Sequence, residues 1–307
     1  MSSVEASRFL AAMKRRIERF LARKPAPTDE KTLSPDYLWL ELTSHRRNRH
    51  ALVIGGTRGL GRTTVRALAS EGSTVSVIGA HSAGETDKEI QSVHHWTVDI
   101  SHTSQLLKTL SEIIQTNGPL TNLVFFQRYR GSGDAWAGEL ETSLTVTRTI
   151  IDHTVESFEP AADCSIVVIS SIASNFVATE QPLSYHVAKA GLGQLARFYA
   201  YSLGPKGIRV NSVSPGSVIK DESKEFYSKN PQIENLYKSI IPLGRMGTSM
   251  EIANVVAFLC SPKSSFLTGQ DIVVDGGISL QWHESMARNL MLGEDVSVTR
   301  PTDVATK

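Results

Sequence analysis

The sequence predicts an α/β protein whose single main domain is a doubly wound parallel sheet of seven strands. Three observations lead to this prediction. Short apolar or β-branched runs alternate with longer stretches of helical periodicity between residues 49 and 278. The first apolar run ends in a glycine-rich turn, and no domain boundary, internal repeat or low-complexity segment interrupts the alternation. Repeated βα units of this kind build a parallel sheet because their crossovers share one hand.

The expected elements follow one another along this domain. The strands are expected at residues 51–54, 74–78, 93–98, 123–126, 165–169, 208–213 and 272–274. The helices are expected directly after the glycine turn and at about residues 102–116, 136–158, 184–203 and 249–260. Residues 217–247 form the longest irregular connection, with helical fragments around residues 222–229 and 233–239. This connection follows the carboxyl end of a strand, a position that suits a substrate lid.

Two extensions flank the domain. Residues 1–48 begin with an amphipathic stretch, residues 4–24, whose apolar side chains recur at helical spacing opposite basic ones. We expect this helix to pack on the main body or on a second subunit. Membrane association through residues 4–24 is the less favoured alternative. Residues 279–307 form a carboxyl-terminal extension whose function the sequence does not indicate.

Composition narrows the classes of function. The 307 residues include 32 Lys and Arg against 31 Asp and Glu, so overall charge predicts neither a nucleic acid nor a membrane as a partner. The two cysteines, Cys164 and Cys260, cannot form a disulfide framework, and no apolar run reaches transmembrane length. Basic residues interrupt the amino terminus where a signal peptide would need an apolar core. We therefore expect a reducing, cytoplasmic location.

The glycine-rich turn after the first strand predicts a phosphate cradle. Gly55 permits a tight turn, while Gly59 and Gly61 lack the Cβ atoms that would keep a pyrophosphate from the backbone N–H groups. These groups stand at the positive end of the following helix, which attracts an anion. Glycine spacing alone is a weak signal, so the flanking strand and helix carry this interpretation.

A tyrosine and a lysine four residues apart predict the catalytic centre. Tyr185 and Lys189 lie on one face of an expected helix. A phenol has a pKa near 10, and a neighbouring ammonium moves it toward the working range by stabilising the phenolate. Ser171 directly follows a buried strand, at the sheet edge where catalytic side chains gather. Ser170 is its nearest rival, but alternation along a strand points adjacent side chains to opposite faces.

These pieces resemble the short-chain dehydrogenase/reductase superfamily, in which a Gly-x-x-x-Gly-x-Gly turn precedes a serine and a Tyr-x-x-x-Lys. Further motifs extend the resemblance over about residues 50–278. They are Asp99-Ile100, Asn211-Ser-Val-Ser-Pro-Gly216, Pro242-Leu-Gly-Arg-Met-Gly247 and Thr268-Gly-Gln-Asp-Ile-Val-Val-Asp-Gly-Gly277. Bacterial 3-oxoacyl-[acyl-carrier-protein] reductases are the members that the chain is most similar to. The resemblance implies a Rossmann-type fold and a homo-oligomer, either a tetramer or a dimer.

The resemblance also implies a division of roles. Tyr185 donates a proton to a carbonyl, Lys189 modulates the tyrosine pKa and binds a ribose, and Ser171 positions the substrate oxygen. Hydride comes from a nicotinamide. Ser143 falls, by spacing, where the family has a proton-relay asparagine, and we include it among the catalytic residues. We expect no metal.

Cofactor choice is argued from the end of the second strand. A carboxylate there would bind the 2′-hydroxyl of NAD, yet Gly79-Ala-His-Ser82 contains none. Arg58 pairs with a 2′-phosphate instead, helped by Ser82 or His81, which predicts NADP(H). The expected cofactor-binding residues are Gly55, Thr57, Arg58, Gly59, Leu60, Gly61, His81, Ser82, Asp99, Ile100, Gln127, Tyr185, Lys189, Pro215, Gly216 and Val218.

The chain departs from the family pattern in several places. Phe126-Gln-Arg-Tyr129 replaces the usual Asn-Asn-Ala-Gly, and Gln127 replaces one of the lost amides. Arg128 and Arg130 are either solvated loop charges, which we favour, or anchors for an anionic substrate or carrier group. Lys220 stands where many members have a threonine that touches the cofactor amide. For Asp99, the alternative to contacting adenine is to cap a helix beside Ser101.

The sequence therefore predicts an NADPH-dependent carbonyl reductase that acts on a small-molecule or carrier-bound ketone. A 3-oxoacyl thioester of fatty-acid or polyketide-type metabolism is the favoured substrate. One alternative is an NADP-dependent dehydrogenase or reductase of a free secondary alcohol or ketone. Another is a weakly catalytic or non-catalytic nucleotide-binding scaffold, suggested by the replaced motif, although Tyr185, Lys189 and Ser171 argue against it.

Overall fold

The computed structural model describes residues 49–81, 84, 90–159 and 162–292. The expected helix at residues 4–24 and Ser82 lie outside these residues. By its contacts the chain divides into two units, residues 1–44 and 45–307.

Seven parallel strands form one sheet, as the sequence predicts. They are β1 (His50–Ile54), β2 (Thr74–Gly79), β3 (Val93–Thr97), β4 (Asn122–Phe125), β5 (Cys164–Ile169), β6 (Ile208–Pro215) and β9 (Asp271–Val274). Their order across the sheet is β3-β2-β1-β4-β5-β6-β9, and every neighbouring pair is parallel. β1, β4, β5 and β6 are buried along their whole length, as expected for strands covered on both faces.

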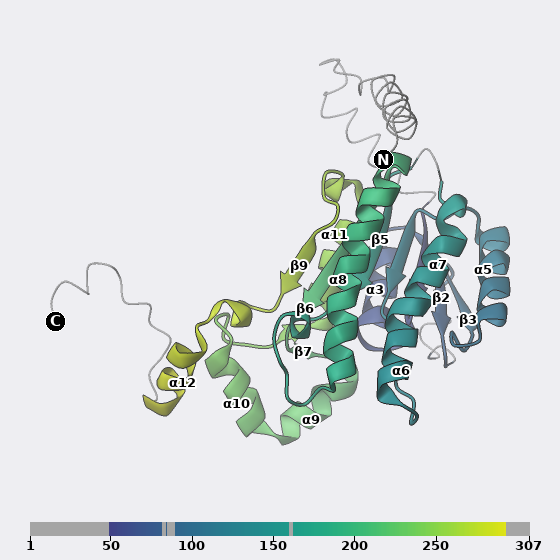
Figure 1. The fold of residues 1–307 in the computed structure, drawn as a ribbon. Coiled ribbons are helices and arrows are strands. Elements are labelled where there is room, and N and C mark those ends of the chain that lie inside the picture. Colours follow the sequence, from purple (N-terminus) through teal and green to yellow (C-terminus); the bar gives the residue numbers. More distant parts are fainter. Residues whose placement is uncertain (1–48, 82–83, 85–89, 160–161, 293–307) are drawn as a thin grey trace, which may run out of the picture. The chain divides into compact units, whose positions relative to one another are not determined.

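Helices cover both faces of this sheet (Figure 1). Their bounds are α3 (Gly59–Ser70), α5 (Thr103–Asn117), α6 (Ala135–Leu140), α7 (Val146–Thr154), α8 (Leu183–Leu203), α9 (Lys224–Lys229), α10 (Pro231–Ile240), α11 (Ser249–Leu259) and α12 (His283–Leu292). α5, α7 and α8 enclose one apolar core, and α3 and α11 enclose another on the opposite face. Strand order reverses direction between β1 and β4, which is where ligands bind in such sheets.

The expected single helix at residues 136–158 is wrong in two respects, because it is interrupted and because its α-helical part ends at Thr154. α6 ends at Leu140, a π-helical turn spans Glu141–Thr145, and α7 continues from Val146. The Thr147 hydroxyl donates to the carbonyl oxygen of Ser143 at 2.7 Å within this stretch. Hydroxyl bonding to the backbone four residues back bends helices, and apolar periodicity does not reveal it.

The connection at residues 217–247 is more ordered than expected. β7 (Val218–Ile219) and β8 (Gly247–Thr248) pair as a short two-stranded sheet, and α9 and α10 lie between them. The helical fragments predicted around residues 222–229 and 233–239 are confirmed to within a few residues. In the carboxyl-terminal extension, α12 begins at His283.

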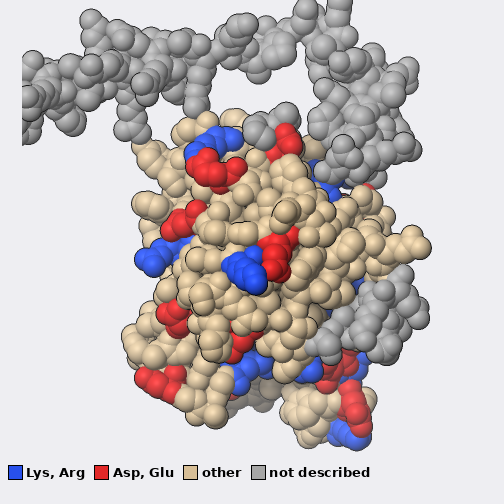
Figure 2. Space-filling model, turned by 90° about the vertical axis from the view of Figure 1, so that its right-hand side faces the viewer, with Lys and Arg blue, Asp and Glu red and all other residues tan. Residues whose placement is uncertain are grey.

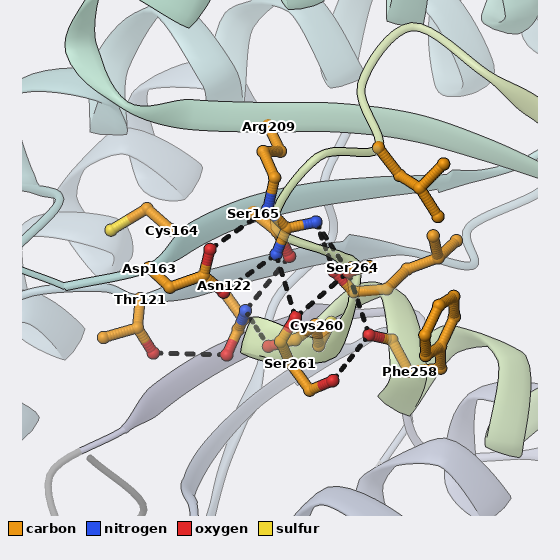
Figure 3. A network of polar contacts seen from close by, with 12 residues as sticks. Thr121, Asn122, Asp163, Cys164, Ser165, Arg209, Phe258, Cys260, Ser261 and Ser264 are labelled. Carbon is orange, nitrogen blue, oxygen red and sulfur yellow. Dashed lines mark hydrogen bonds and ion pairs between the residues drawn. The ribbon is translucent and has the colours of Figure 1, made fainter. Parts of the chain in front are cut away.

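A buried polar network joins the amino-terminal ends of β4, β5 and β6 to the end of α11 (Figure 3). Arg209 Nη2 lies 2.9 Å from Asp163 Oδ2, and Arg209 Nη1 donates to Ser264 Oγ at 2.8 Å and to the Leu259 carbonyl at 3.0 Å. Asn122 Nδ2 donates to the Cys260 carbonyl at 3.0 Å. This network lies at the edge of the sheet opposite the carboxyl ends of the strands, so its role is structural.

Surface charge, helix hydrophobicity and possible metal ligands give little further indication of function among the described residues. On the face seen in Figure 2, basic and acidic side chains are interspersed. No described helix combines the length and apolar character that a bilayer crossing requires. Among the described residues, no group of three or more His, Cys, Asp or Glu side chains could hold a metal ion. Cys164 and Cys260 are both buried free thiols.

Candidate active site

The carboxyl ends of the central strands bring the predicted site residues to one edge of the sheet. Gly55 follows β1, Gln127 follows β4, Ser171 follows β5 and Gly216 follows β6. Side chains at this edge of a doubly wound sheet line the crevice where ligands bind. The sheet alone therefore gathers segments that are far apart in the sequence.

The glycine turn has a backbone that other residues would disrupt. Gly59 has a φ of +51°, a left-handed conformation that side chains disfavour. A Cβ on Gly61 would lie 2.3 Å from the carbonyl oxygen of Gly55, a distance that no real Cβ contact shows. The close passage of α3 against the end of β1 therefore depends on glycine at position 61, a packing role that differs from the pyrophosphate approach expected for this residue.

A carboxylate already binds the amino terminus of α3. The Gly59 N–H donates to Glu222 Oε1 at 3.0 Å, and Arg62 Nη2 lies 3.4 Å from the same oxygen. Burial opposes the charge of Glu222, but backbone N–H groups and Arg62 hold the pKa of its carboxyl below the ordinary value. The turn therefore favours an anion, so these residues fit the pyrophosphate of a dinucleotide. Sequence reasoning missed Glu222 because nothing in the pattern links it to the turn.

α8 places Tyr185 and Lys189 one helical turn apart. Lys189 Nζ lies 5.5 Å from the centre of the Tyr185 ring and donates to the carbonyl of Ile169 at 2.8 Å. Lys189 is only 5% exposed, and burial lowers the pKa of its ammonium to about 8. The nearby charges of Arg128 and Lys220 lower it as well, while Glu139 opposes them. Lys189 thus titrates close to neutral pH beside the proposed proton donor.

The structure distinguishes the two serines after β5. Ser170 is buried, and its hydroxyl donates to the Lys189 carbonyl at 2.8 Å, so it anchors α8 to the sheet. Ser171 is half-buried, and its hydroxyl accepts from the Ala173 N–H at 3.2 Å. The Ser171 hydroxyl proton has no acceptor among the described residues. Ser171 is therefore the serine that suits a substrate oxygen, in agreement with the alternation argument.

Comparison with known proteins agrees with this geometry. A family model described as Enoyl-(Acyl carrier protein) reductase matches residues 55–279. The chain belongs to the short-chain dehydrogenase/reductase superfamily. It is 32% identical over 246 residues to a 3-oxoacyl-[acyl-carrier-protein] reductase of Aquifex aeolicus, covering 74% of this chain and 96% of that protein.

Two further relatives illustrate the range of the superfamily. An isoepoxydon dehydrogenase of Penicillium expansum is 29% identical, and the match covers 77% of this chain and 97% of that protein. A solved short-chain dehydrogenase/reductase of Serratia marcescens superposes with a TM-score of 0.68 at 25% identity, over 76% of this chain and 99% of that one. Members of the superfamily use a nicotinamide dinucleotide, NAD(P)(H), to oxidise or reduce their substrates.

Ser143, which sequence spacing assigns to the position of the superfamily's relay asparagine, lies in the π-helical turn and is fully buried. Its hydroxyl donates to Glu139 Oε1 at 2.7 Å. Glu139 is itself buried and is the carboxylate that opposes the loss of the Lys189 proton. Sequence reasoning missed Glu139, although its spacing of four from Ser143 on a helix was a usable signal. The hydrogen-bonded Ser143–Glu139 pair therefore places a negative charge near Lys189 that favours its protonated form.

In the loop after β4, Gln127 and Arg128 stand where the superfamily has its Asn-Asn-Ala-Gly motif. Gln127 is buried, and its Nε2 donates to Thr147 Oγ1 at 2.7 Å, while its Oε1 lacks a partner among the described residues. Arg128 is half-buried, with its guanidinium carbon 4.5 Å from the centre of the Tyr185 ring. The expectation of a solvated loop charge is therefore wrong for Arg128. Arg130 is exposed, as expected.

The residues predicted to bind the adenine half of the cofactor make fewer contacts that support their predicted role. Asp99 accepts hydrogen bonds from the N–H and the hydroxyl of Ser101, at 3.0 and 2.7 Å, in the turn before α5, whose N-cap is His102 and not Asp99. Arg58 and His81 are exposed. Of the remaining predicted contacts, Thr57, Leu60, Ile100, Gly216 and Val218 are half-buried and Pro215 is buried. Their contacts with a cofactor stay predictions.

We expect ketone reduction to slow as the pH rises through about 8. Lys189 carries its charge below that pH, and only the ammonium stabilises a Tyr185 phenolate, so deprotonation removes the stabilisation. The profile of kcat/KM against pH measures this directly. Glu139→Gln removes the group that opposes proton loss, so the falling limb should move to lower pH. If the midpoint of the falling limb is the same in Glu139→Gln and in wild type, titration of Lys189 does not cause the pH dependence.

Proposed function

We propose that the chain is an NADPH-dependent carbonyl reductase. One observation carries the proposal: Tyr185, Lys189 and Ser171 stand at the edge of the sheet that also bears the anion-binding glycine turn. A nicotinamide dinucleotide held by the glycine turn and Lys189 would supply a hydride to the carbonyl carbon. The chain's own residues then manage the oxygen, on which negative charge develops.

Each residue has a separate task in this step. Ser171 donates its hydroxyl proton in a hydrogen bond to the substrate oxygen and holds it in place. Tyr185 transfers its phenolic proton to the same oxygen, leaving a phenolate. Lys189 stabilises that phenolate by its charge, and Glu139 helps the lysine to keep its proton.

We propose NADPH rather than NADH because of Arg58. No carboxylate lies among Gly79, Ala80 and His81 at the end of β2, and Arg58 at the start of α3 is exposed without an ion-pair partner in the described chain. We expect Arg58→Ala to weaken NADPH binding about tenfold, as for loss of a charge-assisted hydrogen bond. NADH affinity should not change. Calorimetric titration of both cofactors tests this, and equal losses for the two would refute the assignment.

Two substrate classes follow from the relatives. The resemblance to 3-oxoacyl-[acyl-carrier-protein] reductases supports a 3-oxoacyl thioester. The isoepoxydon dehydrogenase relative and the unusual loop at residues 126–133 support a free secondary alcohol or ketone. The test is NADPH consumption with 3-oxoacyl thioesters, enoyl thioesters and free ketones. Turnover of none of them would favour the nucleotide-binding scaffold.

We also propose a cytoplasmic homo-oligomer, a dimer or a tetramer. Large apolar side chains on the outer face of α8, including Phe198 and Tyr201, are exposed in the single chain, and Phe266 is fully exposed. Exposed apolar patches of this kind mark subunit interfaces. Light scattering of the purified protein measures the assembly state.

A further inference from the structure

Arg128 is fixed beside the catalytic tyrosine. Its Nη2 donates to Gln181 Oε1 at 2.7 Å, and its guanidinium carbon stands 4.5 Å from the centre of the Tyr185 ring. Its Nε is shielded from solvent and has no hydrogen-bond partner among the described residues. A buried donor without an acceptor is costly, and a charged one more so.

The surroundings of Arg128 hold more positive than negative charge. Burial lowers the pKa of Lys220, and the charges of Arg130 and Arg128 lower it further. No described carboxylate forms an ion pair with Arg128 or Arg130. Glu139 is hydrogen-bonded to Ser143, and Glu222 is bound by the Gly59 N–H and Arg62. Cations that repel one another around a reaction centre favour an anionic ligand.

We propose that Arg128 binds a carboxylate of the substrate, so that the enzyme reduces a small oxo acid. This inference rests on the carbonyl reductase proposed above and narrows its substrate. A guanidinium binds a carboxylate through two parallel N–H···O bonds, and the Nη1 of Arg128 has no hydrogen-bond partner among the described residues. The stacked Tyr185 ring and Gln181 hold the guanidinium in position before the ligand binds.

The position of Arg128 favours a carboxylate of the substrate over the phosphate of a carrier arm as its anionic ligand. Its guanidinium lies over the very ring whose hydroxyl protonates the substrate oxygen. Because a carbon–carbon bond is about 1.5 Å long, an anion at Arg128 and a carbonyl at Tyr185 are separated by only a few bonds. The phosphate of a long carrier arm attached to a 3-oxoacyl group would lie too far from the carbonyl. The geometry therefore favours a carboxylate within the substrate itself.

We expect the negatively charged pyrophosphate of the cofactor to bind at the glycine turn after β1 and not at Arg128. Gly59 presents its N–H to an anion, and the stem of Lys220 passes 3.5 Å from the position of a Cβ on Gly59. The stem of Lys220 therefore lies beside the glycine turn. Arg128, stacked on Tyr185, is the cation at the substrate end.

The experiment compares acids with their neutral esters. Acetoacetate, levulinate and their methyl esters are assayed with wild type, Arg128→Gln, Arg128→Lys and the control Arg197→Gln, which removes an exposed charge on α8. We expect wild type to prefer acid to ester in kcat/KM. Arg128→Gln should lower this preference by roughly 10- to 100-fold, as for loss of a charged hydrogen bond. Arg128→Lys should restore part of the preference, and Arg197→Gln should leave it unchanged.

Binding is measured separately from turnover. Levulinate is titrated calorimetrically into the complex of Tyr185→Phe with NADPH, which keeps the ring under Arg128, with and without Arg128→Gln. Weaker binding of levulinate but not of its ester in the double variant supports the proposal. Equal preference for acid and ester in wild type, or loss of NADPH affinity alone in Arg128→Gln, would overturn it. Esters reduced in a Tyr185-dependent way without an acid preference would refute this inference while leaving the carbonyl reductase intact.

Discussion

Tyr185→Phe is expected to lower kcat for ketone reduction by about 10²- to 10⁴-fold, the range of a lost general acid. The phenol is the only proton donor that the proposal assigns to the carbonyl oxygen, and Lys189 Nζ lies 5.5 Å from the centre of its ring. Phenylalanine keeps the ring that Arg128 stacks on, so cofactor affinity and the melting temperature should stay close to wild type. Steady-state kinetics and a cofactor titration measure both.

Tyr201→Phe is the matched control for this variant. Tyr201 lies on the same helix, α8, but it is 78% exposed, and its hydroxyl has no role in the site. It should leave kcat unchanged. Equal kcat values for wild type and Tyr185→Phe would remove Tyr185 from the reaction, and equal losses in both tyrosine variants would point to damage to α8 instead.

Arg209→Met is expected to destabilise the fold by about 3 kcal/mol, the lower end of the range for breaking a buried ion pair. The lower end applies because Asp163 keeps some contact with solvent. Loss of the guanidinium leaves Asp163, the Leu259 carbonyl and Ser264 without their shared donor. Denaturant unfolding at fixed protein concentration measures the change.

Arg197→Met controls for the loss of an arginine as such. Arg197 is exposed and donates a 3.4 Å hydrogen bond to Gln194 Oε1 within α8. We expect a change below about 0.5 kcal/mol, as for an ordinary surface substitution. If the free energy of unfolding falls by the same amount in both variants, the buried network in Figure 3 contributes no more to stability than an exposed arginine does.

The sheet was predictable because its strands are buried on both faces. Ala51–Ile54 and Ile166–Ile169 are continuous apolar runs of strand length, the first followed by Gly55 and the second by Ser170. The glycine turn and the pair Tyr185 and Lys189 were also predictable, because each depends on short-range spacing. The superfamily resemblance then linked them into one site.

The remaining features depend on contacts between distant segments. Glu222 meets Gly59 across 163 positions of sequence, and Arg209 meets Ser264 across 55. Arg128 looked like a loop charge because the sequence does not show that its loop folds back over Tyr185. No periodicity encodes such contacts, so a sequence predicts the chemistry of these side chains but not their partners.

Transfer of a deuterium label tests the central claim most directly. The protein is incubated with NADPH deuterated at the reactive nicotinamide carbon and with the panel of ketones, and the alcohols are analysed by mass spectrometry. The proposal predicts that wild type forms an alcohol carrying one deuterium on the former carbonyl carbon, and that Tyr185→Phe forms almost none while still binding NADPH. Bound NADPH that transfers no deuterium to any ketone, or equal labelling by both proteins, would contradict it.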